Sequence, residues 1–451
     1  MRLNSAKIII LILLIMVLLA LSCQCANNKV STGDHAETTL GDWAECFGDS
    51  SRTASVSFRL DLPLEQVWRR KINSELLPPV CKDNHLITAT DSMNDRSSEE
   101  LICLDARNGD VIWTKTVDVE TVGGVYIAGD LAVFVVYVAD VNSNATTDTK
   151  SKIICLEMQT GDRIWELELP DEAGRVSMCN VCFKDKEGFV VAEKGSVYVV
   201  DLEEGKITRK FNLLPKGYIL NPMTALGGRK LIMGSLKIGS YTQEICAIDI
   251  DSDEICWKRR FDEVKADYCY YNGLVIVMLS PVLLQKTRVA VVALDINNGR
   301  TKWSLDMSSD WTTGSFIGLV SWSLSKEEGL MLFTLAGKTV NSGQQQCLAY
   351  CIDAKSGQLC WKKELEMELE PGDGPGAIIA DDIGVIGEVR SAHIDSSSLF
   401  FCDMHNGNII DMKETGSLSY MIAGADSLFT AEEFIDNTNG ESLSTEVCCY
   451  R

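Results

Sequence analysis

Five of the nine tryptophans in this chain of 451 residues end the same 11-residue pattern, and a sixth, Trp68, lies one period before the first of them. The pattern reads small residue, any residue, Asp, three residues, Gly, three residues, Trp. Complete copies run from Cys103 to Trp113, from Ala293 to Trp303 and from Cys351 to Trp361. A fixed period of this size predicts an array of small supersecondary units, none of which buries its apolar face alone.

Imperfect copies complete the series. They carry Glu157 in place of Asp before Trp165, Asp253 in place of Gly before Trp257, and Arg209 and Asp411 in place of Trp. Counted from Trp68, the last position of each copy recurs at steps of 44 to 58 residues. Such a period is long enough for a four-stranded propeller blade or for a pair of helices.

The residues between the copies favour strands. Runs such as 132–138, 197–200 and 289–294 are rich in β-branched and aromatic residues, which suit a pleated surface. In the pattern itself, the Asp side chain accepts hydrogen bonds from turn amides, and Gly supplies the left-handed conformation that closes a short loop. The Trp then lies on the outgoing strand, where its ring packs between blades.

This pattern resembles the tryptophan-docking repeat of the quinoprotein dehydrogenase-like propellers, known as PQQ-like repeats. The resemblance covers nearly all of residues 60–451. It implies a β-propeller, and it offers two branches of function. One branch holds the PQQ-dependent alcohol dehydrogenases, and the other is non-catalytic and includes the BamB lipoprotein of outer-membrane assembly.

Counting blades gives eight. A two-strand segment precedes each turn motif, but the eighth segment ends at Arg451, where the Asp of the pattern is due. The missing outer strand is found at the other end of the chain, in Leu64 to Lys71 with Trp68 at the docking position. We therefore predict an all-β fold, an eight-bladed propeller of four-stranded antiparallel blades over 56–451, closed by its N-terminal strand. The alternative is seven blades and a ragged end.

The first 55 residues are predicted to lie outside the fold. Residues 1–22 have a basic start and an apolar run from Ile8 to Leu21, which indicates a signal peptide too short for a comfortable membrane span. Cys23 is a candidate lipid-attachment site; simple cleavage and an uncleaved anchor are the alternatives. Residues 23–55 are polar and repeat-free, as expected of a tether. The protein is thus expected to be exported, to the periplasm or the extracellular side.

The composition of the chain argues against some classes of partner. Removal of Arg2 and Lys7 with the leader leaves 40 basic against 64 acidic residues, a net charge of −24. This argues against nucleic acid and anionic membrane surfaces as partners. The 17 cysteines do not indicate a disulfide scaffold, since several occupy the first position of the pattern, where Ala247 and Ala293 stand in sister copies. Equivalent positions in different blades are too far apart to bridge.

The sequence offers no catalytic, cofactor or metal site. Its four histidines form no metal-ligand pair, and the single CxxC, Cys179 to Cys182, has no second pair beside it. No segment matches the calcium and catalytic Asp motifs that a PQQ enzyme needs at the propeller axis. We therefore predict a monomeric binding scaffold for envelope proteins without a cofactor; the alternative is a quinoprotein or other cofactor-dependent oxidoreductase.

Binding is expected on the face opposite the turn motifs. There the loops between second and third strands are irregular, and variable loops on a regular scaffold usually carry binding. The loops run over 91–100, 140–152, 235–244, 280–288 and 337–346. Leu283, Leu284 and Trp311 are the candidate partner-binding residues on that face. Packing of each on a neighbouring blade is the alternative.

Overall fold

The computed structural model describes 43–45, 48–91, 98–139, 149–176, 179–212, 214, 218–237, 242–262, 264–281, 288–312, 321–340, 345–367, 374–389, 396–436 and 442–451. Residues 38–451 form one compact unit. None of the helices among the described residues has the length and apolar character needed to cross a membrane.

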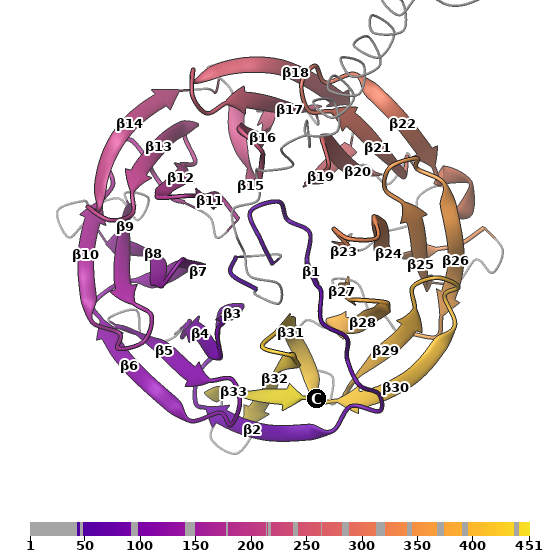
Figure 1. Cartoon of the computed structure of the whole chain (residues 1–451), viewed down its shortest axis with the longest axis horizontal. Coiled ribbons are helices and arrows are strands. Elements are labelled where there is room, and N and C mark those ends of the chain that lie inside the picture. Colours follow the sequence, from indigo (N-terminus) through magenta and orange to yellow (C-terminus); the bar gives the residue numbers. More distant parts are fainter. Residues whose placement is uncertain are drawn as a thin grey trace, which may run out of the picture. The chain divides into compact units, whose positions relative to one another are not determined.

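The unit is a ring of eight antiparallel four-stranded sheets, each running outward from the axis (Figure 1). Blades 1 to 4 consist of β3 (Val80–Lys82), β4 (His85–Ala89), β5 (Glu99–Asp105) and β6 (Val111–Val117); β7 (Thr121–Ala128), β8 (Leu131–Ala139), β9 (Thr149–Glu157) and β10 (Arg163–Glu168); β11 (Val181–Lys184), β12 (Glu187–Val191), β13 (Ser196–Asp201) and β14 (Lys206–Asn212); β15 (Tyr218–Gly227), β16 (Lys230–Lys237), β17 (Thr242–Asp249) and β18 (Glu254–Asp262).

Blades 5 to 8 complete the ring. They consist of β19 (Val264–Tyr271), β20 (Leu274–Pro281), β21 (Ala290–Asp295) and β22 (Thr301–Asp306); β23 (Ser321–Leu324), β24 (Leu330–Lys338), β25 (Gln345–Asp353) and β26 (Leu359–Leu365); β27 (Gly374–Ala380), β28 (Ile383–Val389), β29 (Ser397–Asp403) and β30 (Ile409–Thr415); β31 (Ser417–Gly424), β32 (Ser427–Asp436), β33 (Ser442–Tyr450) and β2 (Gln66–Ile72). A short 3-10 helix, η1 (Ser308–Asp310), follows blade 5, and β1 (Ser55–Val56) pairs with β27.

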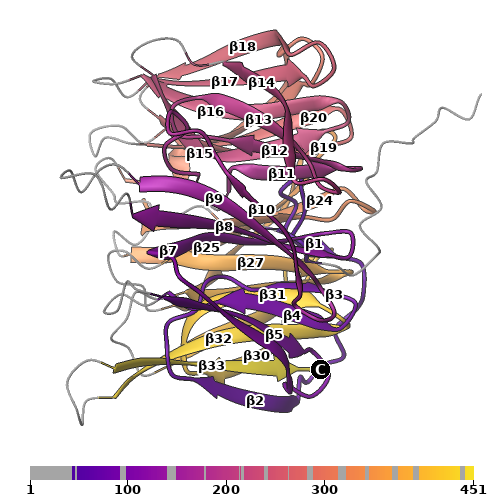
Figure 2. The ribbon, with the colours of Figure 1, turned by 90° about the vertical axis from the view of Figure 1, so that its left-hand side faces the viewer.

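The two ends of the chain close the eighth blade. β2 runs antiparallel to β33, with Trp68 opposite Cys449, and Figure 2 shows the two strands side by side. Where other blades have their turn motif, Glu65 and Arg451 instead exchange backbone hydrogen bonds of 2.7 and 3.0 Å. The predicted eight-blade closure is confirmed, and the seven-blade alternative is wrong.

The turn motif has the predicted mechanism. In blade 1 a carboxylate oxygen of Asp105 accepts the amide hydrogen of Arg107 at 2.9 Å, and Gly109 has a φ of 75°. A β-bulge follows each of these turns, because two residues of the outer strand face one residue of the third strand. The bulge sets the Trp at the position from which it reaches the next blade.

The docking tryptophans hold adjacent blades together. Each indole N–H donates to the carbonyl oxygen of the residue that follows the motif acid in the next blade. The pairs are Trp68 with Ala106, Trp113 with Met158, Trp165 with Leu202, Trp257 with Ile296, Trp303 with Ala354 and Trp361 with Met404, at 2.7 to 3.1 Å. Each ring also covers the motif Gly of that turn, where an added Cβ would lie 2.4 to 2.7 Å from ring atoms. Gly is therefore required for the ring as well as for the turn.

Arg209 replaces the docking Trp between blades 3 and 4. Its guanidinium donates at 2.8 Å to the carbonyl oxygen of Ile250, the acceptor position that an indole uses elsewhere. It also pairs at 2.8 Å with Asp253, which stands where the other turns have Gly. The two departures from the pattern are thus one compensating exchange, a cation with a carboxylate in place of a ring on a glycine.

We expect Arg209→Trp alone to lower the free energy of unfolding by about 1–3 kcal/mol, because the ring would meet the Asp253 side chain. Adding Asp253→Gly should recover most of that loss. Chemical denaturation of the two single variants and the double variant gives the coupling energy, expected at about 1–2 kcal/mol. Strictly additive effects would contradict the exchange.

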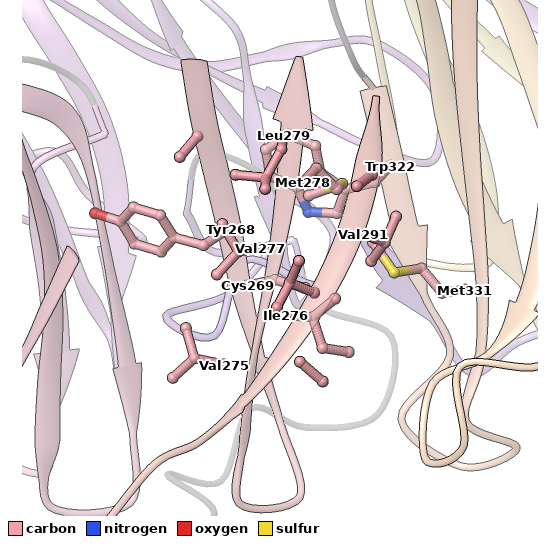
Figure 3. Close-up of a cluster of buried hydrophobic side chains, with 14 of the residues drawn as sticks. Tyr268, Cys269, Val275, Ile276, Val277, Met278, Leu279, Val291, Trp322 and Met331 are labelled. Carbon is pink, nitrogen blue, oxygen red and sulfur yellow. The ribbon is translucent and has the colours of Figure 1, made fainter. Parts of the chain in front are cut away.

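The core lies between the sheets. Figure 3 shows one part of it, where Cys269 and Ile276 of blade 5 lie among apolar side chains beside Trp322 and Met331 of blade 6. Cysteines at the first motif position, Cys103, Cys155 and Cys351, are fully buried. Burial raises the pKa of the Cys103 and Cys155 thiols to about 12. Cysteine serves here as a small apolar residue.

We expect most cysteines to be free thiols in the purified protein. No cysteine within the described residues forms a disulfide in the structure. Thiol titration of the unfolded, unreduced protein should find more than half of them reactive. A protein in which most cysteines are bridged would refute this expectation.

Candidate functional site at the propeller axis

Residues 43–45 and 48–56, the axial plug, lie across the centre of the ring, where Figure 1 shows them as the indigo trace leading to β1. The plug bonds to successive blades through its backbone. Trp43 pairs with Cys81 of blade 1, and carbonyl oxygens of the plug then accept amide hydrogens of Ile127, Leu226, Tyr270 and Leu324 in blades 2, 4, 5 and 6. Finally, Ser55 and Val56 pair with β27 of blade 7.

The plug lies at one particular end of the axis. Leu226, Tyr270 and Leu324 are at or next to the last residues of the innermost strands of their blades. These strand ends lead into the hairpins on the side of the turn motifs. The plug therefore occupies the turn-motif end of the axis.

This placement corrects part of the predicted tether. The sequence predicts a solvated tether over residues 23–55, but within its described part Thr53 and Ala54 are buried, as are Trp43 and Ala44. The physical reason is backbone pairing, since a segment without apolar periodicity can still be ordered by the strand ends that surround it. Residues 23–42, with Cys23, and the predicted signal peptide 1–22 lie outside the described residues.

Arg52 is the central side chain of the plug and has no solvent-exposed surface. Its Nε donates to the carbonyl oxygen of Thr224 at 2.7 Å, and its Nη2 donates to those of Cys179 and Val181 at 3.0 Å each. Its own backbone carbonyl accepts the indole N–H of Trp322 at 3.0 Å. One residue thus connects blades 3, 4 and 6. Its φ of 63° shows that the backbone turns sharply at this point.

Two carboxylates accompany Arg52, and each has a cationic partner. Glu45 lies 3.6 Å from the Arg52 guanidinium and accepts a hydrogen bond from Ser50. Burial raises the pKa of Glu45 to about 7, against the opposing attraction of Arg52. Asp49 lies 2.6 Å from the Lys326 ammonium and accepts from the Thr53 hydroxyl at 2.7 Å. Burial alone would raise the pKa of Asp49, but Lys326 and Thr53 outweigh it, so the pKa is lowered.

The charged side chains at this place form ion pairs with one another. Because Glu45 and Asp49 already face Arg52 and Lys326, their oxygens do not fit a calcium ion with the cofactor it would carry. Among the residues that the structure describes, no group of three His, Cys, Asp or Glu side chains is arranged to hold a metal ion. The arrangement suits structural anchoring of the plug.

The predicted partner-binding residues have different outcomes. Leu283 and Leu284 lie outside the described residues, as does part of each irregular loop. Trp311 is only 3% exposed and belongs to the core shared by blades 5 and 6. It forms a β-bridge with Thr339 just after η1. The expectation that Trp311 is available to a partner is corrected, and its packing alternative holds.

Comparison with known proteins identifies the fold. The family model described as outer membrane protein assembly factor BamB matches residues 60–208 and 220–367. No curated protein matches the chain. BamB from Moraxella catarrhalis is 13% identical, with 85% of this chain and 99% of that chain covered and a TM-score of 0.51.

Two enzymes share the same architecture. A quinohemoprotein alcohol dehydrogenase from Pseudomonas putida HK5 is 12% identical, with 91% of this chain and 80% of that chain covered and a TM-score of 0.58. A europium-containing methanol dehydrogenase is 11% identical, with 92% and 98% covered and a TM-score of 0.59. At these identities the likeness concerns the fold alone.

Proposed function

Since the chain belongs to the family described as outer membrane protein assembly factor BamB, we propose that it is an exported, non-catalytic scaffold that binds other proteins of the cell envelope. The observation that carries this proposal is the axial plug. The family match and the acidic balance of the chain agree with protein partners rather than nucleic acid.

The plug bears on catalysis because quinoprotein enzymes hold their cofactor and calcium at the propeller axis. Here one end of the axis holds the chain's own backbone, fixed to seven blades by backbone and side-chain hydrogen bonds and strand pairing. The charged groups at that place, Glu45, Asp49, Arg52 and Lys326, are committed to one another. A scaffold needs such rigidity, whereas an enzyme needs groups that are free to meet a substrate.

Binding by the proposed scaffold takes place on the face opposite the turn motifs. Leu283 and Leu284 remain the first residues to test there. The predicted signal peptide and lipid attachment at Cys23 belong to the same proposal, because a tethered scaffold is held at a membrane while its blades stay accessible. Loss of membrane association in a Cys23→Ser variant tests the attachment.

We expect no PQQ-dependent activity. Purified protein should be mixed with PQQ and calcium and then assayed for cofactor absorbance and for dye reduction with alcohols and sugars. The expected result is neither retained cofactor nor turnover, because the axial carboxylates are already paired. Stoichiometric PQQ binding with turnover would establish the oxidoreductase alternative in place of the scaffold.

Affinity capture from native membranes tests the binding face. We expect the double variant Leu283→Ser/Leu284→Ser to lose captured envelope proteins while its unfolding free energy changes by less than about 1 kcal/mol, as for exposed sites. Ile410→Ser is the matched control, since Ile410 is 50% exposed on the outer strand β30. Equal capture by the two variants would contradict the assignment of the binding face.

A further inference from the structure

Blade 6 places two cysteines across the bulge of its turn motif. On β25 and β26, Cys351 is paired with Trp361, and the next pair is Ile352 with Leu359. Cys360 is therefore the extra residue of the bulge. In such a bulge two residues of one strand oppose a single residue of its partner. Cys360 and Trp361 thus both face Cys351, at the short cross-strand spacing that a disulfide requires.

The two thiols differ in their exposure to solvent. Cys360 is exposed, whereas Cys351 is completely buried, and both are free in the structure. Burial raises the pKa of Cys351, and the adjacent Cys360 thiol raises it further. The contact between the thiols agrees with the register of the strands. A reagent in solution can therefore reach Cys360, whereas burial protects Cys351 from direct attack.

Blade 4 provides a natural comparison. Cys256 occupies the same bulge position as Cys360, because Trp257 pairs with Ala247 and Ile255 pairs with Ile248. Cys256 is likewise exposed, but the residue opposite it is Ala247 instead of a cysteine. The Lys230 ammonium lies 3.3 Å from the Cys256 sulfur. Both Cys256 and Cys360 are exposed, so a reagent can reach either thiol.

We propose that Cys351 and Cys360 are an oxidation site that forms an intrablade disulfide with a low-molecular-weight disulfide as the oxidant. The Cys360 thiolate attacks one sulfur of the reagent, forms a mixed disulfide and releases one reagent thiolate. Cys351 then attacks the Cys360 sulfur, loses its proton to solvent and displaces the second reagent thiolate. Two protein thiols are oxidised, and one reagent disulfide is reduced to two thiols.

The bond would link the two strands of a hairpin whose turn contacts the neighbouring blade. The same turn supplies the Ala354 carbonyl oxygen, which accepts the Trp303 indole N–H at 3.1 Å, and Gly357, which lies under that ring. Oxidation therefore fixes the docking surface between blades 5 and 6. This oxidation goes beyond the proposed scaffold function and does not depend on it.

The test uses the reduced full chain treated with glutathione disulfide at neutral pH, followed by intact mass and peptide mapping. We expect Cys256 to carry a lasting glutathione adduct. Cys360 should pass through its adduct to a Cys351–Cys360 bond with the mass loss of two hydrogen atoms. Cys351→Ala should leave a lasting adduct on Cys360, and Cys360→Ser should leave Cys351 unmodified.

Two controls separate the proposal from other outcomes. Ala stands at the position of Cys351 in blades 4 and 5, so Cys351→Ala is compatible with this fold. Cys402, a buried neighbour that also raises the pKa of Cys351, is replaced in Cys402→Ala, which should bridge like the unaltered chain. A lasting Cys360 adduct in the unaltered chain, or a bond from Cys351 to Cys402, would overturn the proposal.

Discussion

Trp68→Ala is expected to lower the free energy of unfolding by about 3–5 kcal/mol, as for truncation of a buried Trp. The ring is buried against Gly109 and Phe429, and its N–H bonds to Ala106 at 3.0 Å. Among the described docking tryptophans, only Trp68 lies on a strand that pairs with the opposite end of the chain. Chemical denaturation measures the loss. Trp68→Phe keeps an aromatic ring and removes the hydrogen bond, so it should cost only about 1–2 kcal/mol.

Truncated chains separate the contribution of the closing strand β2 to stability from that of the plug. Chains that start at residues 43, 57 and 73 keep both elements, only β2, or neither. Loss of β2 exposes the edge of β33, so the shortest chain should aggregate while the chain from residue 57 stays monomeric. Equal stability and equal association state for the chains from 57 and 73 would show that closure is unimportant.

Arg52→Met should lower the free energy of unfolding by about 3–5 kcal/mol, the usual cost of breaking a buried ion pair. The change leaves Glu45 buried without its cation and removes the guanidinium as a donor to the carbonyl oxygens of Thr224, Cys179 and Val181. Adding Glu45→Gln should recover part of the loss, because the unpaired carboxylate is then gone. No recovery in the double variant would mean that Glu45 and Arg52 act independently.

The same pair gives a pH dependence. The pKa of Glu45 is raised from 4.5 to about 7, so the folded state binds a proton that the unfolded state releases between these values. Its contribution to stability is fully present below pH 4.5 and is lost as the pH rises through about 7. Glu45→Gln should therefore flatten the fall in unfolding free energy over this range, by up to about 3 kcal/mol. An unchanged pH profile would exclude Glu45 as the titrating group.

The ring could be predicted from the sequence because the ring is periodic. Each Asp, Gly and Trp has a local function that repeats, so spacing alone indicates the strands, the turns and the closing pair around Trp68. From spacing alone, Arg209 and Asp253 are two unrelated departures from the pattern. Their connection is not visible in the spacing because the two residues belong to adjacent copies and pair across them. The signal is nevertheless present, since the Trp and the Gly that meet in one seam are lost together.

The plug could not be predicted, for the opposite reason. Ser50, Ser51, Thr53 and Ala54 bond mainly through their backbones, and backbone pairing leaves no pattern of apolar residues. Loop topology places Trp311 on the surface, but an apolar ring near a loop can turn into the adjacent core. For Leu283 and Leu284 the binding role stays a prediction.

Asp411 lies on the outer strand of blade 7, next to blade 8, where a Trp would have no turn to accept its hydrogen bond. Blade 8 has the start of β2 and the end of β33 in place of a turn, and Lys413 contacts both by donating to the Leu64 carbonyl oxygen at 3.1 Å and lying 4.9 Å from the Tyr450 ring centre. This erosion of the motif is therefore a consequence of how the ring is closed.

The joining of distant chain ends also has a consequence for the order of assembly. Ser55 pairs with Ile379 and Trp68 with Cys449, so β1 and β2 meet their partner strands only after blades 7 and 8 have been made. The blades between them close over short stretches of chain, whereas this final step spans nearly the whole sequence. β2 therefore stays unpaired until β33 has been synthesised, and during that interval the exposed strand favours aggregation and binding by chaperones.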